Sequence, residues 1–158
     1  MASKDFSNIP LFYRFYFRIS DPLICLWGAW MDFVTPAFVL NAFVPAAVAP
    51  HNPDFDFTLQ QLGGSLLMLG FIDVVLLRYT NDIKIWKVLE AAVLIYDLSL
   101  LYSSYSSLGQ QGRLSFGALR WEDWGSIIIT AQAVVVRTAF LLGAGLAEQK
   151  VSKGSKRL

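Results

Sequence analysis

Residues 84–102 read Lys-Ile-Trp-Lys-Val-Leu-Glu-Ala-Ala-Val-Leu-Ile-Tyr-Asp-Leu-Ser-Leu-Leu-Tyr, and this stretch decides the fold. It is apolar on nearly all sides, yet it contains Glu90 and Asp97. The two acids are seven residues apart, so a helix presents both on one face. Three other long apolar stretches of the chain also contain a few ionisable side chains. We therefore predict an all-α protein, a transmembrane four-helix bundle whose ionisable groups turn toward one another.

The composition favours a membrane protein and excludes several other classes. Of the 158 residues, 55% are hydrophobic and only 16% are charged, whereas soluble domains have about 25% charged residues. A net charge of +1 gives no reason to expect a nucleic-acid partner. The single cysteine, Cys25, excludes an internal disulfide and is interpreted as a small apolar residue in a span. His51 is the only histidine and is interpreted as loop surface, so we expect no metal and no cofactor.

We predict one membrane domain over residues 1–158, with spans at about 9–34, 57–79, 84–105 and 123–147. The first span begins among aromatic residues, and Asp21-Pro22 predicts a kink or a new helical start within it. Residues 35–57 are predicted to be a proline-rich loop that lies along the membrane or caps the bundle. Residues 103–120 are predicted to be a loop because they are rich in Ser, Gly and Gln.

Short sequence features predict how the spans are joined and packed. The turn Thr80-Asn81-Asp82 is too short for anything but an antiparallel hairpin of the second and third spans. Small residues allow helices to approach closely, which we expect at Gly63, Gly64, Gly70, Gly143 and Gly145. A chain with three spans, whose first segment only lies on the membrane surface, is the alternative.

The distribution of basic residues predicts the topology. With four spans, ten Lys and Arg residues fall on the side of the two termini, and only Arg113 and Arg120 fall on the other side. Because cytoplasmic loops carry the excess of Lys and Arg, we expect both termini to face the cytoplasm.

Four ionisable residues inside the spans are the candidate catalytic residues: Asp97, Glu90, Arg137 and Asp73. Counted along the helices, Asp97 and Arg137 fall near the middle of the membrane. A charge there costs at least about 2.5–3.5 kcal/mol unless it is paired or hydrated. We predict that Arg137 pairs with Asp97, or with Glu90 or Asp73 if the spans are offset. One cation cannot neutralise three acids, so at least one acid is expected to be protonated, hydrated or facing a ligand.

Two interpretations of these charges remain open. In the first, a structural ion pair fixes the register of the helices. In the second, the charges line a pocket that holds a lipophilic ligand and moves a proton, with Tyr96, Tyr102 and Trp124 as candidate substrate-binding residues. No Ser has the His and Asp partners of a catalytic triad, and no glycine motif for phosphate precedes a helix.

Three segments resemble a family of small four-span fungal membrane proteins that is catalogued as a domain of unknown function. They are Ile9-Pro-Leu-Phe-Tyr-Arg14, the stretch from Arg78-Tyr-Thr-Asn-Asp-Ile to Leu101-Tyr102, and Asp123-Trp-Gly125 with Arg137-Thr-Ala-Phe-Leu-Leu-Gly143. Many members of that family have a His where this chain has Leu100, so chemistry based on that His would be lost or moved here. The resemblance implies an endoplasmic reticulum membrane and a lipophilic intermediate of fungal secondary metabolism.

Three functions follow as hypotheses. The first is a membrane protein that promotes cyclisation of a polyketide or terpenoid, alone or beside a membrane-bound oxidase. In it Asp97 and Glu90 would handle protons, while Arg137 would hold Asp97 ionised or bind a substrate oxygen. The second is a non-catalytic scaffold for other membrane-bound biosynthetic enzymes. The third is a lipid- or sterol-binding four-span protein. The expected partners are therefore a lipophilic small molecule, membrane lipids and other membrane-bound enzymes.

Overall fold

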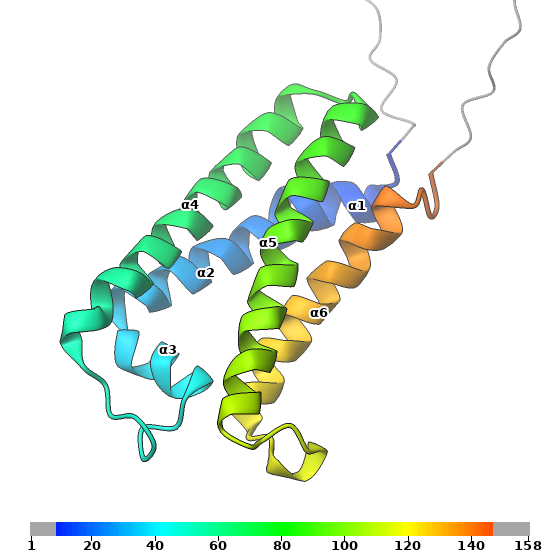
Figure 1. Ribbon diagram of the computed structural model, residues 1–158. Coiled ribbons are helices and arrows are strands. Elements are labelled where there is room, and N and C mark those ends of the chain that lie inside the picture. Colours follow the sequence, from blue (N-terminus) through cyan, green and yellow to red (C-terminus); the bar gives the residue numbers. More distant parts are fainter. Residues whose placement is uncertain (1–8, 147–158) are drawn as a thin grey trace, which may run out of the picture.

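The computed structural model describes residues 9–146, and within this range the chain folds into helices without any strand (Figure 1). The elements are α1 (Leu11–Phe15), η2 (Tyr16–Ser20), α2 (Asp21–Val34), α3 (Pro36–Phe43), η3 (Pro53–Phe55), α4 (Asp56–Tyr79), α5 (Ile83–Gln110), η4 (Phe116–Ala118) and α6 (Trp121–Leu141). The predicted all-α class is confirmed.

Within residues 9–146, two helices are long and apolar enough to cross a membrane: Pro53–Tyr79, which contains α4, and Trp121–Leu141, which is α6. A third span is present if Leu11–Val34 and Pro36–Phe43, which meet at an angle of 107°, form one broken span. The 28-residue α5 is not among these helices, and it carries Lys84, Lys87, Glu90 and Asp97. Membrane-spanning helices are thus supported, while the predicted total of four spans stays a prediction.

The side chains are distributed as in a protein that is surrounded by lipid. Large apolar side chains point outward on several helices, for example Phe71, which is 67% exposed, and Ile95, which is also 67% exposed. The interior instead holds Asp73 and Glu90, each 0% exposed, and Arg137, which is 1% exposed. Soluble proteins seldom bury acids and arginines while exposing large apolar surfaces, so this arrangement favours a membrane environment.

The first helix runs without a break from Leu11 to Val34 but changes its winding at η2, a π-helical segment. The segment ends at Ser20, two residues before Pro22, which has no N–H to continue the hydrogen-bond ladder of an α-helix. The α-helical winding resumes at Asp21, as the Asp-Pro pair predicted. The helix also begins in the aromatic segment, as the length of the predicted span requires.

Two predicted loops contain helix instead. Helix α3 occupies residues 36–43, since Pro36 is well placed in a first helical turn and an apolar run follows it. Helix α5 extends to Gln110, beyond the predicted end near residue 105. Serines near this end of α5 remain compatible with a helix because their hydroxyls donate to carbonyls one turn earlier, such as Ser103 to Ser99 and Ser104 to Leu100.

The end of α6 also differs from the prediction. Gly143 and Gly145 have φ angles of 86° and 71°, so they form the turn after Leu141 rather than a helix-packing surface. Arg137 therefore has about 24 Å of helix before it and only about 6 Å after it. Arg137 therefore lies near one end of α6, whereas counting residues along the longer predicted span of 123–147 placed it near the middle.

The helices pack as two main pairs, α2 with α4 and α5 with α6. At the α2–α4 contact a Cβ on Gly63 would lie 2.9 Å from Phe33, and one on Gly70 would lie 3.1 Å from Cys25. Glycine at these two positions therefore permits the close approach that the sequence predicted. Gly64 has open space around it instead.

The molecule has two distinct ends (Figure 1). At the end we call the terminal end lie α1, the α4–α5 turn and the last turn of α6. An aromatic cluster fills it, formed by buried Ile9, Tyr13, Tyr16, Phe17, Leu77, Trp86 and Phe140. At the opposite end, which we call the loop end, α3 packs near the segment that joins α5 to α6.

Candidate functional site

Arg137 of α6 is the centre of the buried charges. Its Nη1 donates to Asp97 Oδ2 at 2.6 Å, and its Nη2 donates to Asp21 of α2. Its Nε lies 3.2 Å from Oε2 of Glu90, which is an ion pair without hydrogen-bond geometry. The predicted pairing of Arg137 with Asp97 is confirmed, and one guanidinium joins α2, α5 and α6.

A fourth acid, Asp73 of α4, extends this group of charges. Its charge acts on Arg137 and on Glu90, and neither of its carboxyl oxygens has a hydrogen-bond partner. Both oxygens of Glu90 also lack a hydrogen bond. We call Asp21, Asp73, Glu90, Asp97 and Arg137 the interior charge cluster. It contains one arginine and four carboxyl groups, so it has more acid than its own cation can neutralise.

A cavity of about 70 Å³ opens beside the interior charge cluster. Its polar lining comes from Asp21, Asp97 and Arg137, together with Tyr96 and Thr130. The remaining lining is mostly apolar: Ile24, Cys25, Leu66, Leu69, Val93, Leu100, Ile129 and Ala133. A small polar centre in an otherwise apolar cavity is the usual form of a site for a lipophilic ligand.

An apolar groove lies next to this cavity. It has a volume of about 280 Å³ and lies between α2 and α4, lined by Pro22, Leu23, Leu26, Leu66, Leu67, Gly70, Phe71 and Val74. Leu66 lines both the groove and the cavity. The side chain of Leu66 therefore separates an outer apolar surface from the interior charges.

The predicted site residues do not all lie at the cavity. Asp97, Arg137 and Tyr96 line it. Asp73 and Glu90 are fully buried in the cluster but are not part of the lining. The other two predicted substrate-binding residues, Tyr102 and Trp124, lie away from the cavity. Tyr102 is 72% exposed on α5.

Trp124, the second of these predicted substrate-binding residues, packs against Phe116 at the loop end. The centroids of the two rings are 4.9 Å apart. Because neither Tyr102 nor Trp124 reaches the cavity, the structure gives no support for a role of either in binding a ligand there. His51, interpreted from the sequence as loop surface, bonds through Nε2 to Asp56 at 2.7 Å.

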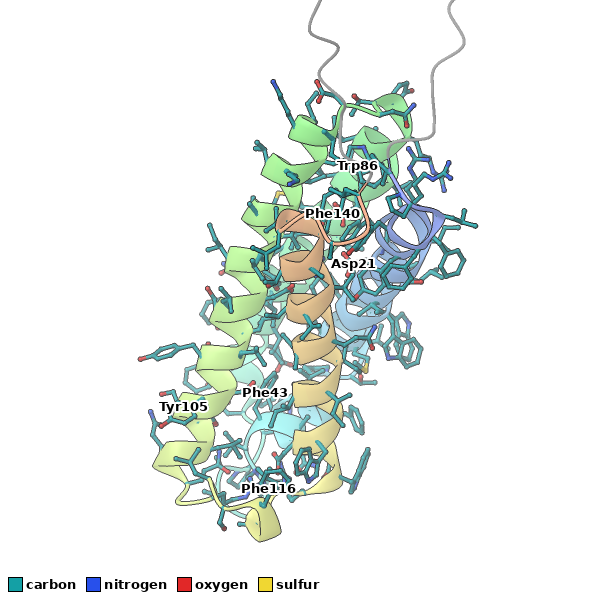
Figure 2. The ribbon with its side chains drawn as sticks, turned by 90° about the vertical axis from the view of Figure 1, so that its right-hand side faces the viewer. Asp21, Phe43, Trp86, Tyr105, Phe116 and Phe140 are labelled. Atoms are coloured by element: carbon teal, nitrogen blue, oxygen red, sulfur yellow. The ribbon has the colours of Figure 1, made fainter. Side chains whose placement is uncertain are left out.

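Asp21 is the site residue that the sequence did not reveal. It precedes Pro22, and that pair was interpreted only as a helix signal. The available signal was its position one helical turn before Cys25 in an apolar stretch, where a solvated acid is not expected. Figure 2 places Asp21 just inside the aromatic cluster that contains Trp86 and Phe140. The cluster therefore closes the site toward the terminal end.

A second group of charges lies at the loop end. Arg113 Nη2 pairs with Asp123 Oδ2, and Arg120 Nη2 lies 3.3 Å from Asp123 Oδ1. Asp123 also accepts the backbone N–H of Arg120 at 2.7 Å, so it caps the start of α6. Arg120 Nη2 donates to the carbonyl of Asn41 at 2.7 Å and so ties α6 to α3. We call Arg113, Arg120 and Asp123 the loop-end charge cluster.

Comparison with known proteins gives one match. The model of a family described as a domain of unknown function, DUF7704, matches residues 6–147. No match was found among curated proteins or solved structures.

Proposed function

The chain belongs to the DUF7704 family, whose function its description leaves open, and we propose a function from the interior charge cluster. The protein is a four-span bundle in the endoplasmic reticulum membrane with both termini in the cytoplasm. It promotes the cyclisation of a lipophilic polyketide or terpenoid intermediate of fungal secondary metabolism, alone or beside a membrane-bound oxidase.

One observation carries this proposal: Asp21 and Asp97 both pair with Arg137, and all three line one cavity with apolar walls. A structural ion pair needs one acid for its arginine. Here three acids form ion pairs with one arginine, and a fourth buried acid, Asp73, belongs to the same cluster. Buried ionisable groups in a membrane protein mark functional sites by default. The excess of carboxyl groups supports a site that holds protons.

The arrangement suits proton transfer without a redox step. Asp97, paired with Arg137, is ionised and takes the proton of an attacking substrate hydroxyl. Glu90 and Asp73 lie behind the cavity lining, and their carboxyl oxygens have no hydrogen-bond partner, so these two acids hold the proton that is passed to the oxygen whose bond to carbon breaks. A ring closes as that bond breaks, and the product has the same composition as the substrate. Arg137 stabilises the negative charge that develops on oxygen.

The groove between α2 and α4 supports access for a lipophilic substrate. The cavity alone, at about 70 Å³, holds only a small part of a polyketide or terpenoid. The adjoining groove of about 280 Å³ is lined by apolar residues only. The reacting end of the substrate enters past Leu66, and its hydrocarbon remainder lies in the groove.

The positions of the described basic residues support the topology. Arg14, Arg18, Arg78 and Lys87 belong to elements at the terminal end, whereas Arg113 and Arg120 lie at the loop end. Since an excess of Lys and Arg marks the cytoplasmic side, the terminal end faces the cytoplasm. The basic residues of the tails, including Lys4, Lys150 and Lys153, lie outside the described residues.

The test is a comparison of metabolites in the source organism with and without the gene. Deletion is expected to cause accumulation of an open-chain compound with the same mass as the lost cyclic product. A wild-type copy restores the product, and an Asp97→Asn copy does not, because the base is removed. Asp54→Asn changes an exposed acid of η3 and is the matched control, which is expected to restore the product.

The amount and thermal stability of the Asp97→Asn protein in membranes are measured in parallel, so that loss of the fold is recognised. Full restoration by Asp97→Asn would contradict the proposal. A scaffold predicts that same restoration, with other membrane enzymes still bound to the variant.

A further inference from the structure

Three arginines gather at the terminal end, away from the cavity. Arg14 and Arg18 are one helical turn apart, so they share a face of the first helix. Arg18 Nη2 donates to Oδ1 of Asn81 at 3.1 Å, which brings it to the α4–α5 turn. Arg78 lies in the last turn of α4, three residues before Asn81. The three arginines therefore lie at neighbouring positions of the terminal end, and we call them the arginine cluster.

The central arginine of this cluster is fixed in position. The guanidinium carbon of Arg18 lies 4.9 Å from the ring centroid of Trp86, which is a cation–π contact. Trp86 is fully buried, and its Nε1 donates to the carbonyl of Thr80 at 2.9 Å. Arg18 is thus held by an anchored ring and by Asn81. Its position does not depend on a bound partner.

The arginine cluster lacks an anion within the described chain. Among residues 9–146, no carboxylate forms an ion pair with Arg14, Arg18 or Arg78. The Nε atoms of Arg14 and Arg18 are buried and have no hydrogen-bond partner. Three like charges at close range repel one another, and buried N–H donors without acceptors are costly. An anion with several acceptor oxygens would correct both defects.

The surroundings of the arginine cluster indicate which kind of anion binds. The same helix exposes Leu11 (73%), Phe12 (58%), Phe15 (55%) and Ile19 (44%). Exposed apolar side chains of this kind contact lipid acyl chains at the interface of a membrane, whereas a free phosphate ion would make no contact with them. A molecule that is anionic at one end and apolar at the other matches both features.

We propose that Arg14, Arg18 and Arg78 bind the phosphate of an anionic phospholipid whose acyl chains lie against the exposed apolar face of α1 and η2. Guanidinium groups hold phosphate oxygens by paired N–H donors, which lysine cannot reproduce. The site is independent of the cavity and of any reaction there.

The test is native mass spectrometry of the full-length protein in detergent, with phosphatidylserine and phosphatidylcholine of identical acyl chains. Wild-type protein is expected to retain phosphatidylserine in preference. Arg14→Gln and Arg78→Gln are each expected to weaken that retention about fivefold, as one basic group near an anionic lipid contributes. Neither substitution removes the contacts of Arg18 with Asn81 and Trp86. Lys84→Gln, with the same loss of charge at the same end, is the control and is expected to retain the lipid.

Three outcomes would overturn the proposal. Equal retention of both lipids would show that the site does not select an anion. An equal loss in Lys84→Gln would show that only the net charge of this end matters. Displacement of phosphatidylserine by millimolar inorganic phosphate would identify a site for free anions. The thermal stability of each variant is measured alongside, and if one substitution prevents folding, the other carries the test.

Discussion

The loop-end charge cluster and the interior charge cluster differ in which sign is in excess. At the loop end, Arg113 and Arg120 share the carboxylate of Asp123. Their remaining N–H groups donate to neutral oxygens, such as Gln111 Oε1 at 2.7 Å from Arg113 and the carbonyl of Asn41 at 2.7 Å from Arg120. In the interior, one arginine faces four carboxyl groups, and several of their oxygens have no donor.

This difference separates a structural role from a chemical one. The remaining N–H donors of the two arginines have acceptor oxygens within the protein, so the loop-end charge cluster is complete without a ligand. The cluster also holds α3 against α6. Extra carboxylates accept hydrogen bonds but cannot donate them while ionised. The interior charge cluster therefore requires protons, water or a ligand to complete it. Protons held at these carboxyl groups are the ones that the proposed reaction transfers.

The largest expected effect comes from removing the arginine on each side of this comparison. Arg137→Leu leaves four buried acids without a cation, and we expect a loss of about 3–5 kcal/mol in the free energy of unfolding. Arg113→Leu leaves Asp123 paired with Arg120 and capping α6, so we expect about 1 kcal/mol. Unfolding in mixed detergent micelles measures both values.

A second substitution tests the reason for that loss. Adding Asp21→Asn to Arg137→Leu removes one uncompensated acid and is expected to restore part of the stability. If the double variant is less stable than Arg137→Leu by the full cost of Asp21→Asn alone, charge imbalance is not the cause.

A smaller effect is expected from Asp123→Asn. This change removes the charged partner of two arginines and weakens the cap of α6, so a loss of about 1.5–3 kcal/mol is expected in the same unfolding measurement. The cyclic product is expected to persist in cells, because the interior charge cluster is unchanged. Loss of product with the protein present at normal amounts would mean that the two clusters are functionally coupled.

The path past Leu66 gives a prediction that uses Cys25, the only cysteine of the chain. Because Cys25 lines the cavity, its labelling by a membrane-soluble pyrene maleimide reports entry from the lipid. Leu66→Ala is expected to raise the labelling rate several-fold, and Leu66→Phe to lower it. A membrane-impermeant charged thiol reagent is the control and is expected to label all three proteins poorly. Faster labelling by that reagent would indicate entry from water instead.

The smallest effect is expected at the tyrosines of α5. Tyr102 is 72% exposed and contributes no oxygen to the cavity, so Tyr102→Phe is expected to change stability by less than about 0.5 kcal/mol and to leave the product unchanged. Tyr96→Phe removes a hydroxyl from the lining and is expected to reduce product formation. Equal product levels in both variants would exclude a role for the Tyr96 hydroxyl.

Much of this fold was predictable because apolar length and turn chemistry are local properties. The hairpin of α4 and α5 follows from Thr80-Asn81-Asp82, where Asp82 Oδ1 accepts the N–H of Lys84 at 2.9 Å. The pairing of Arg137 with Asp97 was predictable because an unpaired cation in the membrane interior is energetically unfavourable. The misjudged segments were the proline-rich stretch that contains α3 and the stretches rich in Ser or Gly. In a membrane helix, serine hydroxyls bond to their own backbone, while glycine serves equally for packing and for helix ends.

The cavity was less predictable because it depends on how the helices are offset. Counting residues gives depth along one helix but not the rotation or shift between two helices. Glu90 and Asp97 do share a helix face, yet only Asp97 reaches the cavity. Asp21 begins the α-helical segment after η2, and the Asp-Pro pair predicted that segment but not that its carboxylate would pair with Arg137.

The most direct measurement is infrared difference spectroscopy of the protein reconstituted in lipid at neutral pH. The excess of acid over arginine predicts a carbonyl band of protonated carboxyl groups in the wild type. Asp73→Asn and Glu90→Gln are each expected to reduce that band, and Asp123→Asn is expected to leave it intact. A wild-type spectrum without protonated carboxyl groups would contradict the proposal that the interior charge cluster stores protons.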